Sequence, residues 1–450
     1  MGSPEPEAAS LRESRDEEGR PFARLPGPLR SAAGLARTPL YRSSFALVLT
    51  TAANAGFGLL FWTLAARLYS TEEVGRGAAA VAALQLVSML GCTGLTPALV
   101  RLVPPSRLHT ARLVLGIYAA GTTVALIAGI CVLIATNVGV EELAVPGYVY
   151  LLAIPIFALF TLQDGVLIGL RREGLVPIEN TIYGMIKIGL LVAFSTGGAA
   201  GIFVAWSLST LLLVAPVNFL LFRRFIPVHS ARESGARREF SPGDIARFAG
   251  GNHVSGLLMA FPDFLMPIIV LQAAGAEETA FFYAAWQLVW PLRLVASQIA
   301  NAFTAQAAED DRKARDLLRR AGFLALAIFV PLVLVLGFGA HPLLRLLFGS
   351  EYAANGENVM RLLAPGLLPS AFLFLAVAYA RVQRQVGRLL FLSVMYSALS
   401  LPLSVGLVSW LGIDGAGLAW LASQSVAAGI ALAVWSLGLF SGRRGEELPE

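Results

Sequence analysis

The sequence predicts an all-α polytopic membrane protein with about 12 transmembrane helices in two six-helix lobes. Three observations support this fold class. The 450 residues are 56% hydrophobic and only 14% charged, with a mean hydropathy of +0.69, whereas soluble globular chains are about 25% charged. The apolar runs are about 20 residues long, which is the length that crosses a bilayer. Arginine residues are concentrated in alternate loops between these runs, as expected for a chain that crosses the membrane repeatedly.

The chain begins with a polar segment, residues 1–42, which is rich in proline and mixed in charge. It has no apolar core of the signal-peptide kind, and its composition predicts a disordered cytoplasmic tail. Residues 19–42 contain five arginines and no acidic residue. We therefore expect this part of the tail to lie against the anionic inner leaflet.

The apolar runs that follow meet the criterion of about 20 residues for a membrane span. They are residues 45–68, 74–103, 113–135, 148–170, 178–194, 200–222, 245–271, 278–306, 317–338, 359–380, 389–411 and 415–440. The sequence thus predicts an even number of spans, numbered below in this order.

The composition of the loops predicts that both termini are cytoplasmic, because cytoplasmic loops carry an excess of lysine and arginine. The segments that this orientation places inside are all rich in arginine: residues 101–112, 171–173, 223–247, 309–320, 381–388 and 443–450. Most opposite loops are short and acidic or neutral. The exception is residues 339–358, predicted to form the longest outer loop.

Short motifs recur about 200 residues apart. Residues 82–87 (AALQLV) return as residues 284–289 (AAWQLV), and two weaker pairs follow in the same order. Repeats in a fixed order indicate two similar halves, and an even number of spans in each half brings both into the membrane from the same side. The predicted parts are a lobe at 43–224, a cytoplasmic linker at 225–244, a second lobe at 245–440 and a cytoplasmic tail at 441–450.

The seventh and eighth spans carry polar and aromatic side chains in helical register. The residues that share one face are Asn252 and Asp263 in the seventh span, and Trp286, Trp290, Arg293 and Asn301 in the eighth. An ionised side chain at membrane depth costs roughly 2.5–3.5 kcal/mol on insertion scales, so it usually faces protein or water. These faces therefore either line a cavity or neutralise each other and hold the two helices together.

Direct pairing of Asp263 with Arg293 is left open by the helix geometry. At 1.5 Å per residue, Asp263 lies ~14 Å and Arg293 ~22 Å from the turn between their helices. A long arginine side chain can bridge this difference of about 8 Å, but the spacing does not require it.

Other polar residues fall inside the predicted spans of the first half. Lys187 lies near the middle of the fifth span, where it either pairs with Asp164 of the fourth span or supplies a cation to a cavity or an ion-coupling site. Asp164 is close to the inner surface, within reach of Arg171 or Arg172. Gln85 in the second span either lines a cavity or hydrogen-bonds between helices.

Motifs of soluble enzymes are missing from the sequence, which contains no Walker loop and no HExxH. The four histidines show no metal-ligand spacing: His109, His229, His253 and His341. We therefore predict that the protein is not an enzyme and has no metal and no cofactor. The formal net charge of +5 reflects orientation in the membrane and predicts no nucleic-acid partner.

Four stretches of the sequence resemble one family of membrane proteins. They are residues 65–75 (AARLYSTEEVG), 94–104 (GLTPALVRLVP), 163–172 (QDGVLIGLRR) and 346–352 (LLFGSEY). These stretches resemble the polysaccharide flippases of the MOP superfamily, the Wzx-like oligosaccharide flippases. They occur in both halves and extend over nearly the whole chain after Arg42.

This resemblance implies a MATE/MOP-like fold with a central cationic cavity between spans one, two, seven and eight. It implies alternating-access transport of an undecaprenyl-pyrophosphate-linked oligosaccharide, from the inner to the outer leaflet of a bacterial inner (plasma) membrane, for cell-surface polysaccharide and lipopolysaccharide biosynthesis. The implied partners are this lipid-linked oligosaccharide, membrane lipids, H⁺ or Na⁺ as a coupling ion, and glycan-assembly proteins.

A lipid-linked glycan requires cations for its pyrophosphate, and amides and aromatic faces for its sugars. The residues expected to line the cavity are Asn54, Gln85, Asn252, His253, Trp286, Trp290, Arg293 and Asn301, with Arg293 on the pyrophosphate. The candidates for ion coupling or charge pairing are Asp263, His253, Lys187 and Asp164. The remaining tryptophans considered are assigned to packing or to the membrane interface: Trp62, Trp206, Trp410 and Trp420.

Other functions are alternatives to this one. A MATE-type multidrug or cation antiporter requires acidic residues in the cavity of the first lobe, and the first span has none. The lipid II flippases have two more spans. A membrane-embedded glycan-assembly enzyme typically needs a sizeable outer loop, for which residues 339–358 are the longest candidate. A non-transporting scaffold would be closed and apolar around Asp263 and Arg293.

Overall fold

The computed structural model describes residues 39–136, 144–231, 240–307, 314–383 and 385–436. Within these ranges the regular structure is helical, and no strand occurs in them. The two predicted tails, residues 1–42 and 441–450, fall almost entirely outside the described residues, so their predicted disorder stays a prediction.

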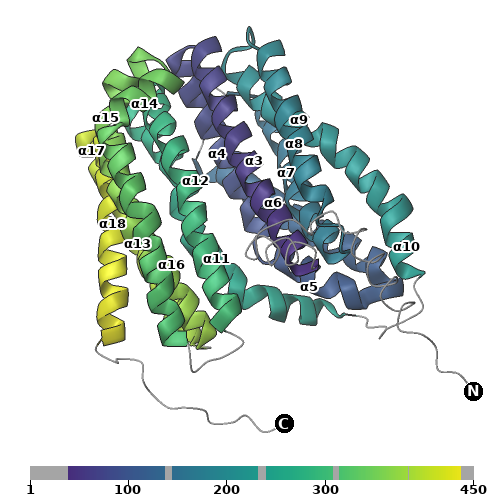
Figure 1. Ribbon diagram of the computed structural model, residues 1–450. Helices are drawn as coiled ribbons and strands as arrows, with labels where there is room; N and C mark the ends of the chain where they lie inside the picture. The colour runs from purple at the N-terminus through teal and green to yellow at the C-terminus, as the bar shows by residue number, and fades with distance from the viewer. Residues whose placement is uncertain (1–38, 137–143, 232–239, 308–313, 384, 437–450) are drawn as a thin grey trace, which may run out of the picture.

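The first half of the chain forms the helices that run from purple to teal in Figure 1. Their bounds are α3 (Pro39–Leu68), α4 (Thr71–Cys92), α5 (Leu95–Ser106), η1 (Arg107–His109), α6 (Thr110–Thr136), α7 (Gly147–Gly169), α8 (Leu175–Ala193), α9 (Gly198–Leu220), η2 (Leu221–Phe225) and α10 (Ile226–Ser230).

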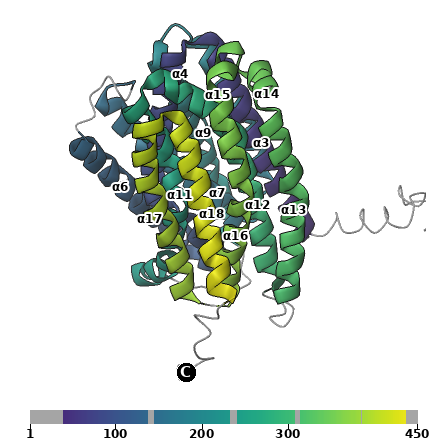
Figure 2. The same cartoon turned by 90° about the vertical axis from the view of Figure 1, so that its left-hand side faces the viewer.

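The second half forms the helices that run from teal to yellow. Their bounds are α11 (Pro242–Ala274), α12 (Ala276–Ala307), α13 (Ala314–Phe338), α14 (Ala340–Leu347), α15 (Ser350–Leu363), η4 (Ala364–Gly366), α16 (Leu367–Val382), α17 (Val386–Leu411) and α18 (Ile413–Ser436). Figure 2 shows α17 and α18 side by side on the outer flank of this group. The exact limits of the two predicted lobes stay a prediction, because the predicted linker includes residues outside the described ranges.

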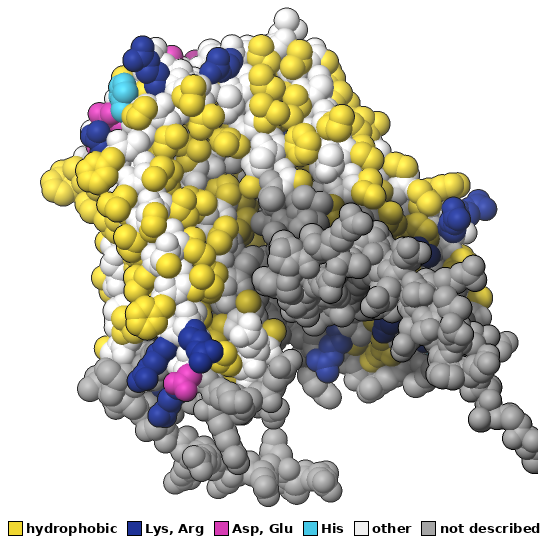
Figure 3. All heavy atoms as spheres, viewed as in Figure 1, with side chains coloured by type: hydrophobic (Ala, Val, Ile, Leu, Met, Phe, Trp, Pro, Cys, Tyr) yellow, Lys and Arg dark blue, Asp and Glu magenta, His cyan; other side chains and the backbone are white. Residues whose placement is uncertain are grey.

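The surface confirms the predicted class, a polytopic α-helical membrane protein. In the described part of the chain, ten helical segments are long and apolar enough to cross a bilayer. Large apolar side chains cover the flank in Figure 3, whereas arginines gather towards the helix ends. Phe338 is 84% exposed and Trp410 79% exposed, a state that lipid accommodates and water does not.

Two predicted spans are helices that fall outside these ten segments. Residues 45–68 belong to α3, of which only part of the side chains is described, and residues 278–306 belong to α12. Polar residues such as Gln287, Arg293 and Gln298 lower the hydropathy of α12. This helix packs against α4, α11 and α16, so protein contacts replace the lipid that its polar face would otherwise meet.

The prediction of a long outer loop at residues 339–358 is wrong. This segment forms α14 and the first turns of α15, and α15 continues through η4 into α16 as one stretch from Ser350 to Val382. In α14, Ala340 and Leu344 are buried while His341 and Arg345 are exposed. This amphipathic spacing at i and i+4 allows a polar segment to form a helix on the protein surface.

A capping box fixes the sharp reversal between α3 and α4. The Glu73 backbone N–H donates to Ser70 Oγ at 3.3 Å, and the Ser70 backbone N–H donates to Glu73 Oε2 at 2.9 Å. Such reciprocal bonds satisfy two N–H groups that a helix start would otherwise leave free. The turn places the end of α3 and the beginning of α4 beside the α11–α12 turn.

The two groups of helices are in close contact at this end of the molecule, which is the end predicted from the arginine distribution to face outwards. A Cβ atom on Gly75 would lie 1.8 Å from the Ala276 carbonyl oxygen, so only glycine fits there. Gly275, at the α11–α12 turn, has φ +93°, a backbone conformation that favours glycine. Across the same junction, Arg67 Nη2 donates to the Leu346 carbonyl oxygen at 2.9 Å. The cavity described below is therefore closed towards this end.

Candidate functional site

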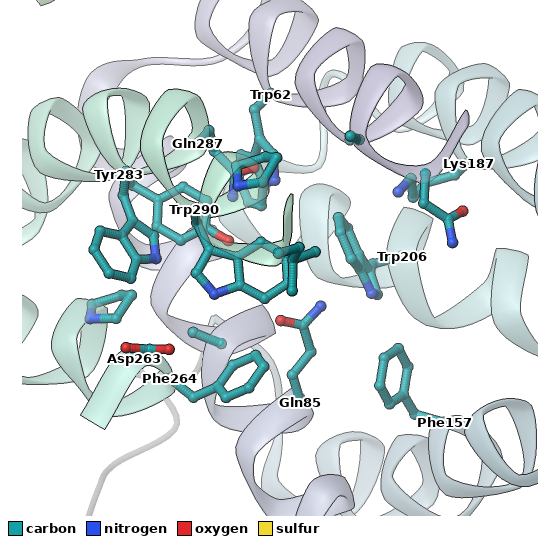
Figure 4. Close-up of a pocket in the computed structure, with 18 of the residues that line it drawn as sticks. Trp62, Gln85, Phe157, Lys187, Trp206, Asp263, Phe264, Tyr283, Gln287 and Trp290 are labelled. Atoms are coloured by element: carbon teal, nitrogen blue, oxygen red, sulfur yellow. The ribbon is translucent and has the colours of Figure 1, made fainter. Parts of the chain in front are cut away.

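A cavity of about 300 Å³ lies between the two groups of helices. Its walls come from α3, α4, α7, α8 and α9 of the first group and from α11 and α12 of the second. Figure 4 shows side chains from both groups pointing into this space. The predicted participation of spans one, two, seven and eight is thus observed, with α7, α8 and α9 in addition.

Aromatic rings form much of the wall. The tryptophans that line the cavity are Trp62, Trp206, Trp286 and Trp290. Near its closed end, the ring of Trp62 lies 4.7 Å from that of Tyr283, a contact that joins α3 to α12 across the two groups. Trp62 and Trp206 were expected to serve in packing or at the membrane interface. Both pack, and both also present a face to the cavity.

Side-chain amides interrupt this aromatic wall. Those that line the cavity are Asn54, Gln85, Asn180 and Gln287. Asn54 and Gln85 were predicted from the sequence, whereas Asn180 and Gln287 were not, although Gln287 lies about one helical turn before Trp290, which was predicted. An amide offers both donors and an acceptor, so these groups suit a ligand that is rich in hydroxyls.

Lys187 of α8 is the cation that the first group presents to this cavity. Its side chain is largely buried, with 4% of the residue exposed. The Nζ atom lies 3.9 Å from the ring centroid of Trp206, 4.9 Å from that of Tyr183 and 5.2 Å from that of Phe61. Aromatic faces attract a cation, so this cage suits an ammonium group, and no anion of the described residues pairs with it.

The ion pair considered between Lys187 and Asp164 is not found. In the described ranges, no carboxylate lies within salt-bridge distance of Lys187. A buried charge without a partner is costly, and such a residue marks a functional site more often than a structural one. The geometry therefore favours the hypothesis that Lys187 supplies a cation to the cavity.

Asp263 of α11 lies on the opposite side of the cavity from Lys187 (Figure 4). It forms a buried ion pair with Arg293 of α12, which answers the question that the helix rise left open. The Tyr396 hydroxyl donates to Asp263 Oδ1 at 3.2 Å, and Gln424 Nε2 donates to that hydroxyl oxygen at 3.0 Å. This network neutralises Asp263 and connects α11, α12, α17 and α18.

Arg293 is turned away from the cavity, which none of its atoms lines. Its guanidinium lies 4.9 Å from the ring centroid of Phe374 and 5.8 Å from that of Tyr396, inside the second group of helices. The length of the arginine side chain covers the offset between its own position and that of Asp263. In this conformation Arg293 can act on a ligand only through Asp263, and its predicted contact with a pyrophosphate stays a prediction.

The other predicted residues have different positions. Trp286 and Trp290 line the cavity, while Asn301 is exposed beyond it and donates to Gln298 Oε1 at 3.5 Å. The side chains of Asn252 and His253 lie outside the described residues. Asp164 does not line the cavity, and its buried Oδ1 atom has no hydrogen-bond partner among the described residues.

Comparisons with known proteins agree with this architecture. A family model described as "Polysaccharide biosynthesis protein" matches residues 40–308, more than half of the chain. A protein of Shigella flexneri named "Putative O-antigen transporter" is 23% identical over 287 residues. That match spans 60% of this chain and 64% of the relative's own length, which is less than two thirds.

Solved structures of similar fold belong to the MOP superfamily. An inward-facing multidrug resistance MATE family transporter superposes with a TM-score of 0.65 at 18% identity, over 87% of this chain and 95% of that one. A MOP superfamily transporter from Pyrococcus furiosus, described as having a binding pocket of reverse polarity, has a TM-score of 0.59 at 16% identity, over 90% and 95% of the two chains. At these identities the similarity establishes the fold.

Proposed function

This chain belongs to the polysaccharide biosynthesis protein family, and from that premise we propose that it is a membrane transporter whose cargo is a lipid-linked oligosaccharide. The protein moves the glycan headgroup of an undecaprenyl-pyrophosphate lipid from the inner to the outer leaflet of a bacterial plasma membrane. The arginine-rich loops and both termini then lie in the cytoplasm.

The observation that carries this proposal is the unpaired cation at Lys187. The cavity contains one neutralised carboxylate, Asp263 with its partner Arg293, and one ammonium group with no anion among the described residues. The cavity is therefore positive on balance, and it attracts a phosphate and repels a cationic drug. Lys187 Nζ donates charge-assisted hydrogen bonds to the pyrophosphate oxygens.

The rest of the wall fits the sugar part of the same cargo. Trp62, Trp206 and Trp290 present apolar faces against which a sugar ring packs, and Gln85 and Gln287 supply hydrogen bonds to hydroxyls. A volume of about 300 Å³ is at the lower end of ligand pockets. In this conformation the cavity accommodates the pyrophosphate and the adjoining sugar, while the polyprenyl tail stays in the bilayer.

Transport proceeds by rocking of the two groups of helices about this cavity. The contacts at Gly75 and Arg67 close the outer end, so the headgroup enters from the cytoplasmic side. Separation of these contacts then opens a path to the outer leaflet, as in alternating access. Asp263 is the candidate that couples this movement to H⁺ or Na⁺, because loss of its charge would release Arg293 and Tyr396.

The test is flipping by the purified protein in proteoliposomes. A fluorescent undecaprenyl-pyrophosphate oligosaccharide is incorporated in both leaflets, and an impermeant quencher added outside reports the fraction that remains protected. We expect that fraction to fall with time only in vesicles that contain the protein, and a soluble oligosaccharide without lipid to compete poorly. Movement of a cationic dye in place of the lipid would contradict the proposal and favour the antiporter.

A further inference from the structure

An apolar groove of about 250 Å³ lies on the outer flank of the second group of helices, between α13, α16 and α18. Figure 2 shows these three helices along one flank, and α16 packs against both of the others. Helix α16 therefore forms the floor of the groove, and α13 and α18 form its walls. The groove shares no lining residue with the central cavity, so it is a separate feature of the molecule.

The groove lies at the end of the molecule that is predicted to face the cytoplasm. Helix α13 begins at this end and contributes residues 318–326, while α16 and α18 finish there and contribute residues 372–376 and 431–432. Along α13 the lining from Arg319 to Leu326 extends ~10 Å. This length is within one half of a hydrocarbon core of about 30 Å, so the groove faces the inner leaflet.

One face of α13 changes from basic to apolar along this groove. Arg319, Gly322, Phe323 and Leu326 stand at the spacing i, i+3, i+4 and i+7, which places them on the same face, and Arg315 lies one turn earlier on it. Phe323 is 72% exposed, as lipid allows and water does not. The order of cations followed by hydrocarbon matches a phosphate headgroup followed by an acyl chain.

Small side chains keep the groove open. Ala376 of α16 and Ala431 of α18 line it beside the buried Leu375. A Cβ atom on Gly322 would meet only Phe372 Cε1, at the ordinary contact distance of 3.8 Å. Apolar atoms that border an unfilled space lose their dispersion contacts on that side, and in a bilayer the chain of a lipid can restore them.

The basic side chains at the mouth of the groove are available to an anion. Arg319 is the charged member of the described lining residues. Arg315, Arg319 and Arg320 are exposed, and none of them takes part in an ion pair within the described ranges. The acid beside them, Asp316, is exposed as well. A guanidinium binds a phosphate through two parallel N–H groups, and its long stem reaches the membrane interface.

We propose that this groove binds a phospholipid with a net negative headgroup from the inner leaflet. One acyl chain lies in the groove, and Arg319 and Arg315 bind the phosphate. Basic sites between transmembrane helices on the cytoplasmic side are typical of anionic lipid binding. The occupant is not the lipid-linked cargo, because the groove has cations of its own and does not join the wall of the central cavity. The bound lipid connects α13 with α18 at their cytoplasmic ends.

The experiment is native mass spectrometry of the full chain, purified in detergent and depleted of lipid. Dioleoyl phosphatidylglycerol or dioleoyl phosphatidylcholine is added at a series of concentrations, because the two share their acyl chains and differ in headgroup charge. We expect a saturable site for phosphatidylglycerol, with an apparent Kd roughly tenfold or more below that of phosphatidylcholine.

Variants assign this site to the groove. Gly322→Leu fills the groove and should remove the tight binding, whereas Gly337→Leu, the same change at an open position near the other end of α13, should keep it. Arg319→Gln should weaken phosphatidylglycerol binding roughly tenfold, and Arg345→Gln, at the opposite end of the molecule, should not.

A cross-linking measurement on the wild type tests the site even if a variant fails to fold. Phosphatidylglycerol with a diazirine in its acyl chain should label residues 318–326, 372–376 or 431–432. Equal binding of the two phospholipids, unchanged binding in Gly322→Leu, or cross-links outside these helices would overturn the proposal. Tighter binding of undecaprenyl phosphate than of phosphatidylglycerol would also overturn it, because the groove would then belong to the carrier lipid. None of these measurements uses the glycan, so failure of the flipping assay leaves their result unaffected.

Discussion

Replacement of Lys187 by methionine separates a functional charge from a structural one. Methionine keeps most of the length of the side chain and its contacts with Phe61, Tyr183 and Trp206, but removes the ammonium group. A hydrogen bond to a charged group contributes roughly 1.5–3 kcal/mol. At about 1.4 kcal/mol per tenfold change, the apparent affinity for the lipid-linked substrate should fall roughly 10- to 150-fold.

The stability of the same variant should not fall along with its affinity for the substrate. The cation–π contacts of Lys187 are worth about 2 kcal/mol when desolvated, whereas burial of an unpaired charge costs several kcal/mol. The melting temperature of Lys187→Met should therefore be unchanged or higher than that of the wild type. Since most core substitutions destabilise, a loss of transport without a loss of stability is a distinctive result.

The assay is the quencher-protection measurement in proteoliposomes at a series of substrate concentrations, with thermal unfolding measured on the same preparations. Lys187→Arg, which keeps the charge, should retain a substantial part of the activity. Met185→Ala, which changes a lipid-exposed residue of the same helix, should behave as the wild type. Full transport affinity in a folded Lys187→Met protein would refute the assignment of the pyrophosphate to this residue.

Three further predictions concern the second group of helices and the closed end. Asp263→Asn leaves Arg293 buried without its carboxylate, so the free energy of unfolding should fall by about 3–5 kcal/mol. The control Glu351→Gln, on the surface, should change it by no more than about 0.5 kcal/mol. Thermal unfolding measures both, and equal stability of the two variants would contradict the ion pair. Tyr396→Phe removes the hydroxyl between Asp263 and Gln424, and it should cost about 1–3 kcal/mol in the same measurement. Gly75→Val places side-chain atoms where the Ala276 carbonyl lies, so it should weaken the closed end of the cavity. An impermeant thiol reagent added outside should then label a cysteine introduced at Gln287 faster than in the control Gly116→Val, whose Cβ meets open space. Identical labelling rates would show that Gly75 does not control closure.

Most of the fold could be predicted from the sequence, because apolar length and arginine position depend on local composition alone. The errors occurred where polar residues lie within helices. Residues 339–358 contain too many polar side chains to be recognised as a span, and only the amphipathic spacing of Ala340 and Leu344 indicates helix. The long second span divides at Thr93 and Gly94, a break that hydropathy does not register.

The candidate site could be predicted only in part. Helical spacing identified Trp286, Trp290 and Asp263 because the three lie on the inward faces of adjacent helices. The aromatic rings that surround Lys187 could not be predicted, since the direction of its side chain depends on the rotation of α8 relative to α7 and α9. Asn180, an amide inside the fifth predicted span, lines the cavity and was overlooked, although its position at the start of an apolar run was a usable signal.

The contact of Arg67 with helix α14 has a consequence for sequence change at the closed end. The guanidinium binds the backbone carbonyl oxygens of Leu346 and Leu347, at 2.9 and 3.5 Å, and arginine commonly satisfies the last carbonyls of a helix in this way. Because the acceptors belong to the main chain, these hydrogen bonds do not depend on the side chains at positions 346 and 347. Related proteins can therefore vary both side chains, provided that helix α14 still ends there and an arginine still reaches its last carbonyl groups.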